Sequence, residues 1–212
     1  VFEVNVTPNR PDCYGAKGIA RDLSATGIGE FMDSPVPEIK TSFVSPVSVK
    51  IETDACPIYT GRYIKNVNNG ESPDWMKQAL ISAGLRPISA LVDITNYLNI
   101  AECRPLHVFD ADKLQGNIIV RSAQEGEKLQ ALDDKEYTLT PEVCVIADEK
   151  KAQCMAGVMG GVDTAVSKDT KNVFLESAYF RPADVAKSGI ITGAQSDSRT
   201  RYERGIDPKS AV

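Results

Sequence analysis

The sequence predicts an α+β protein in which helices pack on a layered, mostly antiparallel sheet. Most helical patterns come first, within residues 12–101, and short alternating strands follow between residues 115 and 180. One more helix is predicted after Pro182. Because helices and strands occupy separate stretches instead of alternating, the order is typical of α+β folds and not of parallel βαβ folds.

Three segments of the first half carry helical signals between a capping residue and a polar or glycine stop. They are residues 12–27, 72–84 and 89–101, with Asp12, Ser72 and Ser89 as the predicted N-caps. The segment 89–101 has apolar residues on nearly every side, which predicts a deeply buried helix. Its Asp93 must then find a polar partner, because a buried carboxylate without one is costly.

Alternating apolar residues predict the strands. These are residues 47–52, 60–67, 117–123, 127–132, 135–140, 144–149, 152–161 and 170–180. Between the first helix and the first strand lies a segment with three prolines and no periodicity. We therefore expect residues 1–46 to be a connecting segment with one helix and a linker, and residues 47–212 to be the main domain.

The composition is that of an ordinary soluble globular protein, with 42% hydrophobic and 25% charged residues. The net charge of −5 argues against a wide nucleic-acid surface. One histidine and five cysteines without a C-x-x-C pair argue against a metal cluster, so no metal site is expected. No apolar run is long enough for a membrane span. The thiols are expected to be reduced in a cytoplasmic protein, and the missing initiator Met suggests a fragment.

His107 is the only histidine of the chain, and two interpretations of it stay open. It is either a partly buried side chain hydrogen-bonded to a carboxylate such as Asp110, or a proton shuttle, for which an ordinary pKa of about 6.5 is suitable. Cys103, four residues away, is a weaker candidate as a nucleophile.

Three further motifs are open to a structural or a functional interpretation. Glu176 shares a strand face with Phe174 and Ala178, so it is either a strand-edge glutamate or a pocket acceptor for a hydroxyl or amine. The glycines of "GVMGG" permit close approach of a strand or a ligand, but lack the Lys and Ser/Thr of a phosphate loop. The three arginines of residues 198–205 are either solvated and paired, or contact a phosphate or carboxylate.

Several segments together resemble one known family. They are, in order, "VTPNRPDC" with "GIARDL", "DITNY" with "PLHVFDADKL", "GVMGG", "LESAYF" and "RYERGIDP". In this order and at this spacing they resemble the B3/B4 region of bacterial phenylalanyl-tRNA synthetase β subunits. The resemblance covers nearly the whole chain and is weakest over residues 30–60.

The resemblance implies a B3/B4-like β-sandwich of unusual topology and an editing function. The family's enzyme is a cytoplasmic class II synthetase, an (αβ)2 heterotetramer that ligates phenylalanine to its tRNA with ATP and Mg²⁺. Its B3/B4 region hydrolyses tyrosine wrongly attached to tRNA(Phe). This chain, with no cofactor of its own, is then a deacylase at most and is not competent for aminoacylation alone. Its implied partners are the α subunit, the rest of the β subunit, tRNA(Phe) and a tyrosyl group.

The resemblance also implies the roles of individual residues. The implied catalytic residues, which position water at the ester, are His107, Asn96 and Thr95. The implied substrate-binding residues are Glu176, Gly160, Gly161, Arg86, Ser196 and Ser198. A site that hydrogen-bonds the extra hydroxyl can select tyrosine, because phenylalanine leaves its polar groups unpaired.

The chain departs from the family at two places. "CRPLHVFD" stands where "GQPLHAFD" is usual, so Cys103, Arg104 and Val108 differ, and Ser198 replaces an alanine. The alternative function is therefore a structural or tRNA-binding module of the synthetase whose editing has decayed. An unrelated small-molecule hydrolase is a third interpretation, without a nearby nucleophile–base pair to support it.

Overall fold

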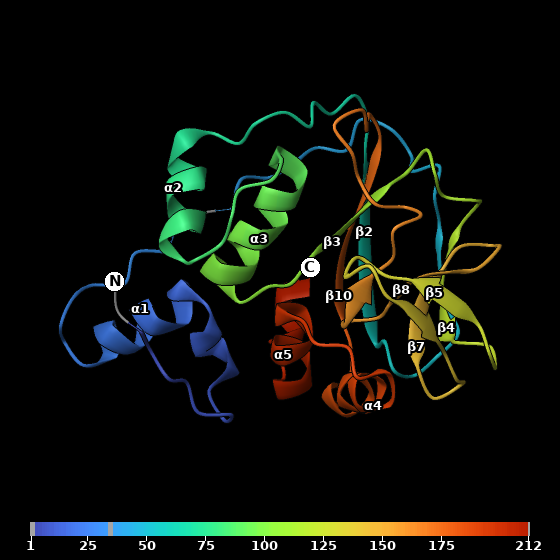
Figure 1. Ribbon diagram of the computed structural model, residues 1–212. Coiled ribbons are helices and arrows are strands. Elements are labelled where there is room, and N and C mark those ends of the chain that lie inside the picture. The colour runs from blue at the N-terminus through green and yellow to red at the C-terminus, as the bar shows by residue number, and fades with distance from the viewer. Residues whose placement is uncertain (1–2, 34–35, 212) are drawn as a thin grey trace.

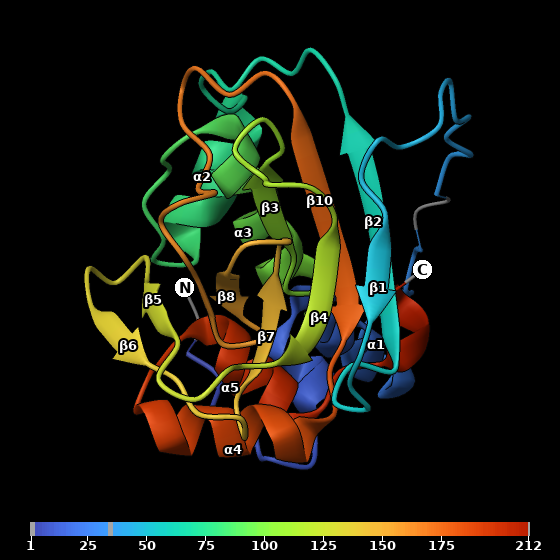
Figure 2. The ribbon, with the colours of Figure 1, turned by 90° about the vertical axis from the view of Figure 1, so that its right-hand side faces the viewer.

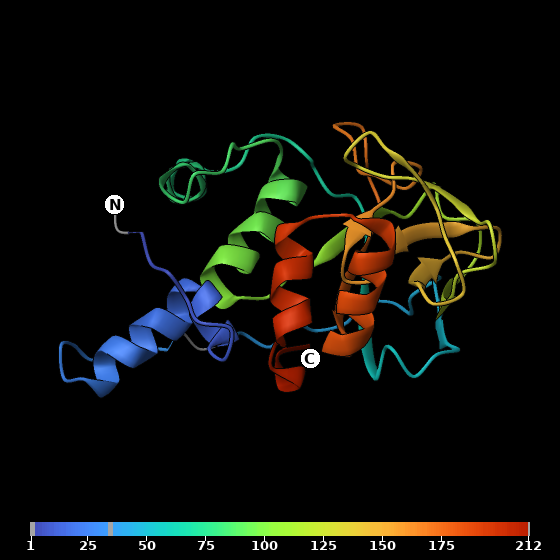
Figure 3. The same cartoon turned by 60° about the horizontal axis from the view of Figure 1, so that its bottom comes forward.

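The computed structural model describes residues 3–33 and 36–211 and has the predicted α+β class. Helices and strands occupy different sides of the molecule, with the strands gathered on the right of Figure 1. Figure 3 shows three helices from distant parts of the sequence, α3, α4 and α5, between the strands and the N-terminal helix. The candidate site forms where these helices meet the sheets.

The strands of the described residues form three sheets (Figure 2). The largest has the order β1-β4-β7-β8-β9, the second β2-β10-β3, and the smallest β5-β6. Only β1 and β4 pair in parallel among the pairs described, so the mostly antiparallel arrangement is confirmed. The bounds are β1 Val49–Ile51, β2 Ile58–Ile64, β3 His107–Asp110, β4 Ile118–Ser122, β5 Lys128–Gln130, β6 Glu136–Thr138, β7 Cys144–Ala147, β8 Ala152–Met155, β9 Met159–Gly160 and β10 Val173–Tyr179.

The predicted helices are present, and the arginine-rich segment adds one that was not predicted. The helices are η1 Pro11–Tyr14, α1 Ala16–Ala25, α2 Asp74–Ser82, α3 Ala90–Glu102, α4 Pro182–Thr192, α5 Asp197–Arg204 and η2 Pro208–Ala211. Ser196 caps α5, because its Oγ accepts a hydrogen bond from the Arg199 N–H at 2.9 Å. This cap is the local signal that the sequence analysis missed in the segment it treated as a polar tail.

One hydrophobic core joins the two larger sheets. Phe109 and Phe174 of the second sheet and Ile118 and Val120 of the largest are all fully buried in the same cluster. The aromatic ring of Phe174 lies over Gly61 of the neighbouring strand, where a Cβ would come within 2.1 Å of it. The two larger sheets therefore share one core, as the two sheets of a β-sandwich do.

The N-terminal segment packs against this body. The Arg201 guanidinium donates to the Tyr14 carbonyl at 3.0 Å, and the Cys103 thiol donates to the Pro11 carbonyl at 3.0 Å. A Cβ on Gly15 would lie 2.4 Å from the Cys103 backbone nitrogen, so this glycine permits the close approach. The division of the chain at residue 46 stays a prediction.

Two predictions about the helices are wrong. The helix α3 is not deeply buried: Asp93 is its only buried residue, and Ile94 is 40% exposed. Asp12 and Ser72 do not cap their helices, because Asp12 binds Arg10 and the Ser72 hydroxyl donates to Asp93. With the Ile88 N–H as a second donor to Asp93, the buried carboxylate is satisfied as the sequence analysis required.

Candidate functional site

Two adjoining cavities lie where β3, β10, the β8–β9 hairpin and α5 meet. The inner cavity has a volume of about 90 Å³ and the outer cavity about 350 Å³. Seven residues line both: Pro105, Leu106, His107, Val158, Met159, Gly160 and Ser198. The two compartments therefore adjoin each other and share part of their lining.

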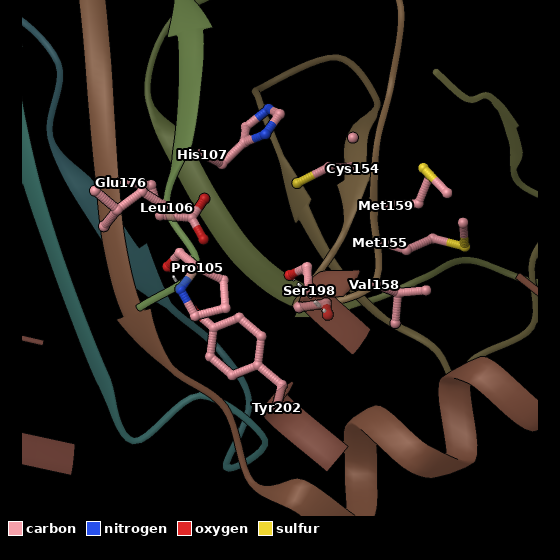
Figure 4. A pocket seen from close by; sticks show the side chains of 12 residues that line it. Pro105, Leu106, His107, Cys154, Met155, Val158, Met159, Glu176, Ser198 and Tyr202 are labelled. Carbon is pink, nitrogen blue, oxygen red and sulfur yellow. Dashed lines mark hydrogen bonds between the residues drawn. The ribbon is translucent and has the colours of Figure 1, made fainter. Parts of the chain in front are cut away.

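Glu176 and His107 are direct neighbours in this site. They are opposite each other in the antiparallel pairing of β10 with β3, and both line the inner cavity (Figure 4). Opposed residues in such a pair have Cβ atoms about 5 Å apart. The expectation that these two groups share one pocket is confirmed, although 69 residues separate them in the sequence.

Glu176 is buried in a central strand, and the strand-edge interpretation is wrong. Its side chain is 4% exposed, and β10 has β2 on one side and β3 on the other. The Tyr59 hydroxyl donates to Glu176 Oε2 at a long 3.4 Å. Burial raises the pKa of Glu176 to about 8, and the Tyr59 hydrogen bond and the Arg104 charge only partly offset this.

His107 has no carboxylate partner within residues 3–33 and 36–211, so the proposed pairing with Asp110 is wrong. Asp110 instead accepts from the Thr170 hydroxyl at 2.7 Å, because its side chain lies on the opposite strand face from the cavity. The His107 ring packs edge-on against Phe109, and its Nε2 is buried without a hydrogen-bond partner. Burial lowers the pKa of His107 to about 4, so the imidazole is neutral at neutral pH.

The two glycines of "GVMGG" have different environments. Gly160 lines both cavities, and a Cβ there would lie 2.6 Å from His107 Cε1. The Gly161 N–H is already used, since it donates to the Gln153 carbonyl at 2.8 Å. A Cβ on Gly161 would meet that same carbonyl oxygen at 2.5 Å. Only Gly160 is therefore in a position to contact a ligand in the cavities.

Two serines at the start of α5 complete the shared wall. The Ser196 hydroxyl donates to the Val158 carbonyl, and the Ser198 hydroxyl donates to the Gly157 carbonyl at 3.2 Å. Ser196 lines the outer cavity and Ser198 lines both. These hydroxyls tie α5 to the β8–β9 hairpin, so the serine that replaces the family's alanine has a structural bond of its own.

The helix α3 forms the opposite wall of the outer cavity. Thr95, Asn96 and Asn99 line it, together with Val92 one turn earlier. The Thr95 hydroxyl donates to the Val92 carbonyl at 2.8 Å, which occupies its only proton. Asn99, which the sequence analysis did not select, has a buried Oδ1 without a hydrogen-bond partner.

Arg86 is not brought to this site. It is exposed in the loop between α2 and α3, and it is not among the described residues that line either cavity. The other eight candidate residues lie in or beside the two cavities, with Gly161 set back in the sheet.

Residues behind the site support it, and sequence reasoning missed three of them. The Arg104 guanidinium donates to the Ala178 carbonyl at 2.6 Å and to the Ser177 hydroxyl, both on β10. The Tyr202 hydroxyl donates to the Ala178 and Pro105 carbonyls, which joins α5 to β10 and to the start of β3. Tyr59 contacts Glu176 as described above. Of these three residues, only Tyr202 could have been selected from the sequence, because it is the aromatic residue between the arginines of α5.

The cysteines of the chain are free, and their environments do not favour nucleophiles. Cys154 lines the inner cavity, but burial raises the pKa of its thiol well above the ordinary value. Burial also raises the pKa of Cys103. Cys13 lies between Asp12 and Asp22, where the Arg10 guanidinium bridges both carboxylates and holds their pKa values low.

Glu176 and His107 thus line one cavity from neighbouring strands of an α+β scaffold. The B3/4 domain family matches residues 55–212, and the chain belongs to this family. It is 49% identical to the phenylalanine–tRNA ligase β subunit of Mesorhizobium japonicum over its whole length, and 50% identical to that of Rhodopseudomonas palustris over 98% of it. It spans about a quarter of these relatives, namely 27% and 26% of their lengths.

A solved structure also resembles the fold. The crystal structure of an N-terminal fragment of the phenylalanyl-tRNA synthetase β subunit from Pyrococcus horikoshii is 20% identical, with a TM-score of 0.49. The similarity covers 86% of this chain and 59% of that chain. Across residues 3–33 and 36–211, no helix has the length and apolar character needed to cross a membrane.

Proposed function

We propose that this chain is the editing part of a phenylalanine–tRNA ligase β subunit. It removes tyrosine from misacylated tRNA(Phe), within a class II enzyme that uses ATP and Mg²⁺ at a different site. The β-subunit relatives and the family of residues 55–212 support the wider assignment. The proposed partners are the α subunit, the rest of the β subunit and tRNA(Phe), in an (αβ)2 heterotetramer of the cytoplasm.

The observation that carries the proposal is the buried Glu176 beside the unpartnered His107. Tyrosine differs from phenylalanine by one hydroxyl, and Glu176 offers a buried acceptor with only a long 3.4 Å bond to Tyr59. A phenol supplies the missing donor, whereas a phenyl ring leaves the carboxyl group without one. The inner cavity can therefore favour the tyrosyl group.

The proposed chemistry is direct attack of an oriented water on the ester carbonyl. The Ser196 and Ser198 hydroxyls already donate to backbone carbonyls, and the buried thiols have raised pKa values, so a covalent intermediate is not favoured. His107, neutral because its pKa is about 4, is suited to orienting water through Nε2 and less suited to carrying a proton. Asn96 and Gly160 are proposed to hold the ester across from it. Positioning then supplies most of the rate.

The first prediction is that Glu176→Ala in the heterotetramer reduces discrimination between Tyr-tRNA(Phe) and Phe-tRNA(Phe). The pKa of Glu176 is about 8, so the carboxyl group is mostly neutral at neutral pH and its hydrogen bond to the phenol is not charge-assisted. A hydrogen bond between neutral groups contributes about 0.5–1.5 kcal/mol, so we expect a loss of roughly two- to tenfold in the ratio of the two deacylation rates. Deacylation of both charged tRNAs measures this ratio. Glu125→Ala, in an exposed turn, is the matched control. An unchanged ratio in the Glu176 variant would show that another group recognises the hydroxyl.

A further inference from the structure

The outer cavity is lined by a residue whose acceptor atom has no partner among the described residues. Asn99 Oδ1 is buried and has no hydrogen-bond partner, although nearly all buried polar atoms in proteins have one. Asn99 lies on α3 one turn after Asn96, and both line this cavity. Asn99 lines a cavity of about 350 Å³, and its carbonyl oxygen has two free lone pairs that a donor group of a ligand can occupy.

The charges around the cavity favour a cationic donor. Among the described residues that line it there is no lysine or arginine, and the neutral His107 adds no positive charge. Asp197 is the one carboxylate on its wall, and Arg201, which lies 3.7 Å from that carboxylate, is not a lining residue. An incoming cation therefore meets a polar surface with no competing positive group.

The helix ends at the cavity also indicate on which side a cation binds. Asn99 is in the last turn of α3, where the helix dipole places partial negative charge, whereas Ser198 is in the first turn of α5, where the partial charge is positive. An aminoacyl ester carries an ammonium group next to an electron-rich carbonyl. The ammonium is stabilised on the α3 side and the carbonyl on the α5 side.

We infer that Asn99 binds the α-ammonium group of the aminoacyl ester, and so fixes the ester beside His107 while Glu176 holds the phenol. This inference rests on the proposed function and adds a second recognition point in the outer cavity. The Glu176 site and the Asn99 site lie in adjoining cavities, which suits a tyrosyl ester because it has a phenol at one end and an ammonium group at the other. Asn99 is thus a binding residue that selects α-amino esters over other esters of the same tRNA.

The test uses the heterotetramer and two esters of tRNA(Phe): the tyrosyl ester and its des-amino counterpart, the 3-(4-hydroxyphenyl)propionyl ester. Each enzymatic rate is divided by the spontaneous hydrolysis rate of the same ester, because the amino group also activates the ester chemically. The parent enzyme should prefer the tyrosyl ester. A hydrogen bond to a charged group corresponds to roughly tenfold or more in rate, so Asn99→Leu should slow the tyrosyl ester by that factor and leave the des-amino ester unchanged.

Two further variants make the result specific. Asn99→Asp keeps an acceptor and should retain the preference for the tyrosyl ester. Asn68→Leu, an exposed asparagine outside the cavity, should behave as the parent enzyme does. Equal slowing of both esters by Asn99→Leu overturns the inference, because it indicates a contact to the ribose or a loss of structure. An unchanged preference for the tyrosyl ester in that variant overturns it as well.

A binding measurement separates this inference from the proposed function. If the parent enzyme clears no Tyr-tRNA(Phe), hydrolysis is not the function, and affinity is then measured with non-hydrolysable 3′-amide analogues of both esters. The aminoacylation site is filled beforehand with a phenylalanyl-adenylate analogue. Tighter binding of the amino-bearing analogue to the parent, lost in Asn99→Leu, supports the ammonium site, whereas equal binding of the two analogues refutes it.

Discussion

Two buried arginines, Arg104 and Arg199, and the polar residues of the cavities lie in the same interior, but their hydrogen bonding differs. Arg199 donates to the Gly189 and Ala194 carbonyls and to Glu203, and Arg104 donates to two serines and a carbonyl. His107 Nε2 and Asn99 Oδ1 have no partner, and Glu176 has one long bond. A saturated group stabilises the fold, whereas an unsatisfied one costs stability and is retained where a ligand supplies the partner.

The largest expected difference between the hydrogen-bonded arginines and the cavity residues is in the pH dependence of the free energy of unfolding. The pKa of Glu176 is raised from 4.5 to about 8, so its contribution to stability is complete below pH 4.5 and is lost as the pH rises towards 8. The pKa of His107 is lowered from 6.5 to about 4, so its contribution is present above pH 6.5 and is lost as the pH falls towards 4. These opposite slopes offset each other between pH 4.5 and 6.5.

Glu176→Gln should therefore remove the loss of stability at higher pH and expose the His107 slope. We expect the variant to gain on the order of 3 kcal/mol relative to the parent between pH 5 and pH 8, because the ionisation of a buried carboxyl no longer opposes folding. Urea unfolding of the two chains at several pH values measures this difference. Parallel pH profiles for the parent and the variant would show that Glu176 ionises normally in the folded chain.

Replacing a saturated group should have the opposite consequence, a loss of stability that does not depend on pH. Arg199→Met removes the donor to the Ala194 carbonyl and one of two donors to the Gly189 carbonyl, which keeps the Gly193 N–H. It also leaves Glu203 without its ion pair. We expect a loss of about 2–4 kcal/mol at any pH between 5 and 8, measured by the same unfolding experiment. A variant as stable as the parent would mean that the arginine is held by packing alone, and the contrast with the cavity residues would fail.

The sequence predicted those parts of the molecule that local patterns determine. Alternation correctly identified β10 and placed Glu176 on the same face as Phe174 and Ala178, which is the buried face in the structure. The pairing of Glu176 with His107 depends on a sheet register across 69 residues, and only the family resemblance pointed to it. The role of Arg199 was missed because its partners are the end of α4 and the turn after it, which charge patterning does not show.

The cap and burial errors have the same origin. Ser72 precedes a helix, yet its hydroxyl pairs with Asp93 of the next helix, because a buried carboxylate needs a donor more than a solvated helix end does. The apolar pattern of α3 suggested burial on every side, but one face of the helix lines the outer cavity and Ile94 is 40% exposed. Contacts between segments distant in the sequence therefore decide whether a serine caps its helix or pairs elsewhere, and which face of a helix is buried.

The smallest expected effect distinguishes two adjacent glycines. In Gly160→Ala the new methyl group meets the His107 ring and a Leu132 methyl, which are side-chain atoms that can move, so the stability loss should be about 1 kcal/mol or less. In Gly161→Ala it meets the Gln153 carbonyl oxygen of the backbone at 2.5 Å, and the loss should be about 1–3 kcal/mol.

The effects on activity should have the opposite order. Gly160→Ala displaces His107, so for each kcal/mol of stability lost it should reduce the deacylation rate more than Gly161→Ala does. Unfolding free energies and Tyr-tRNA(Phe) deacylation rates of both variants measure this. If Gly161→Ala loses more activity at equal residual stability, the ligand contacts the glycine set back in the sheet, and the assignment of Gly160 to the cavity wall fails.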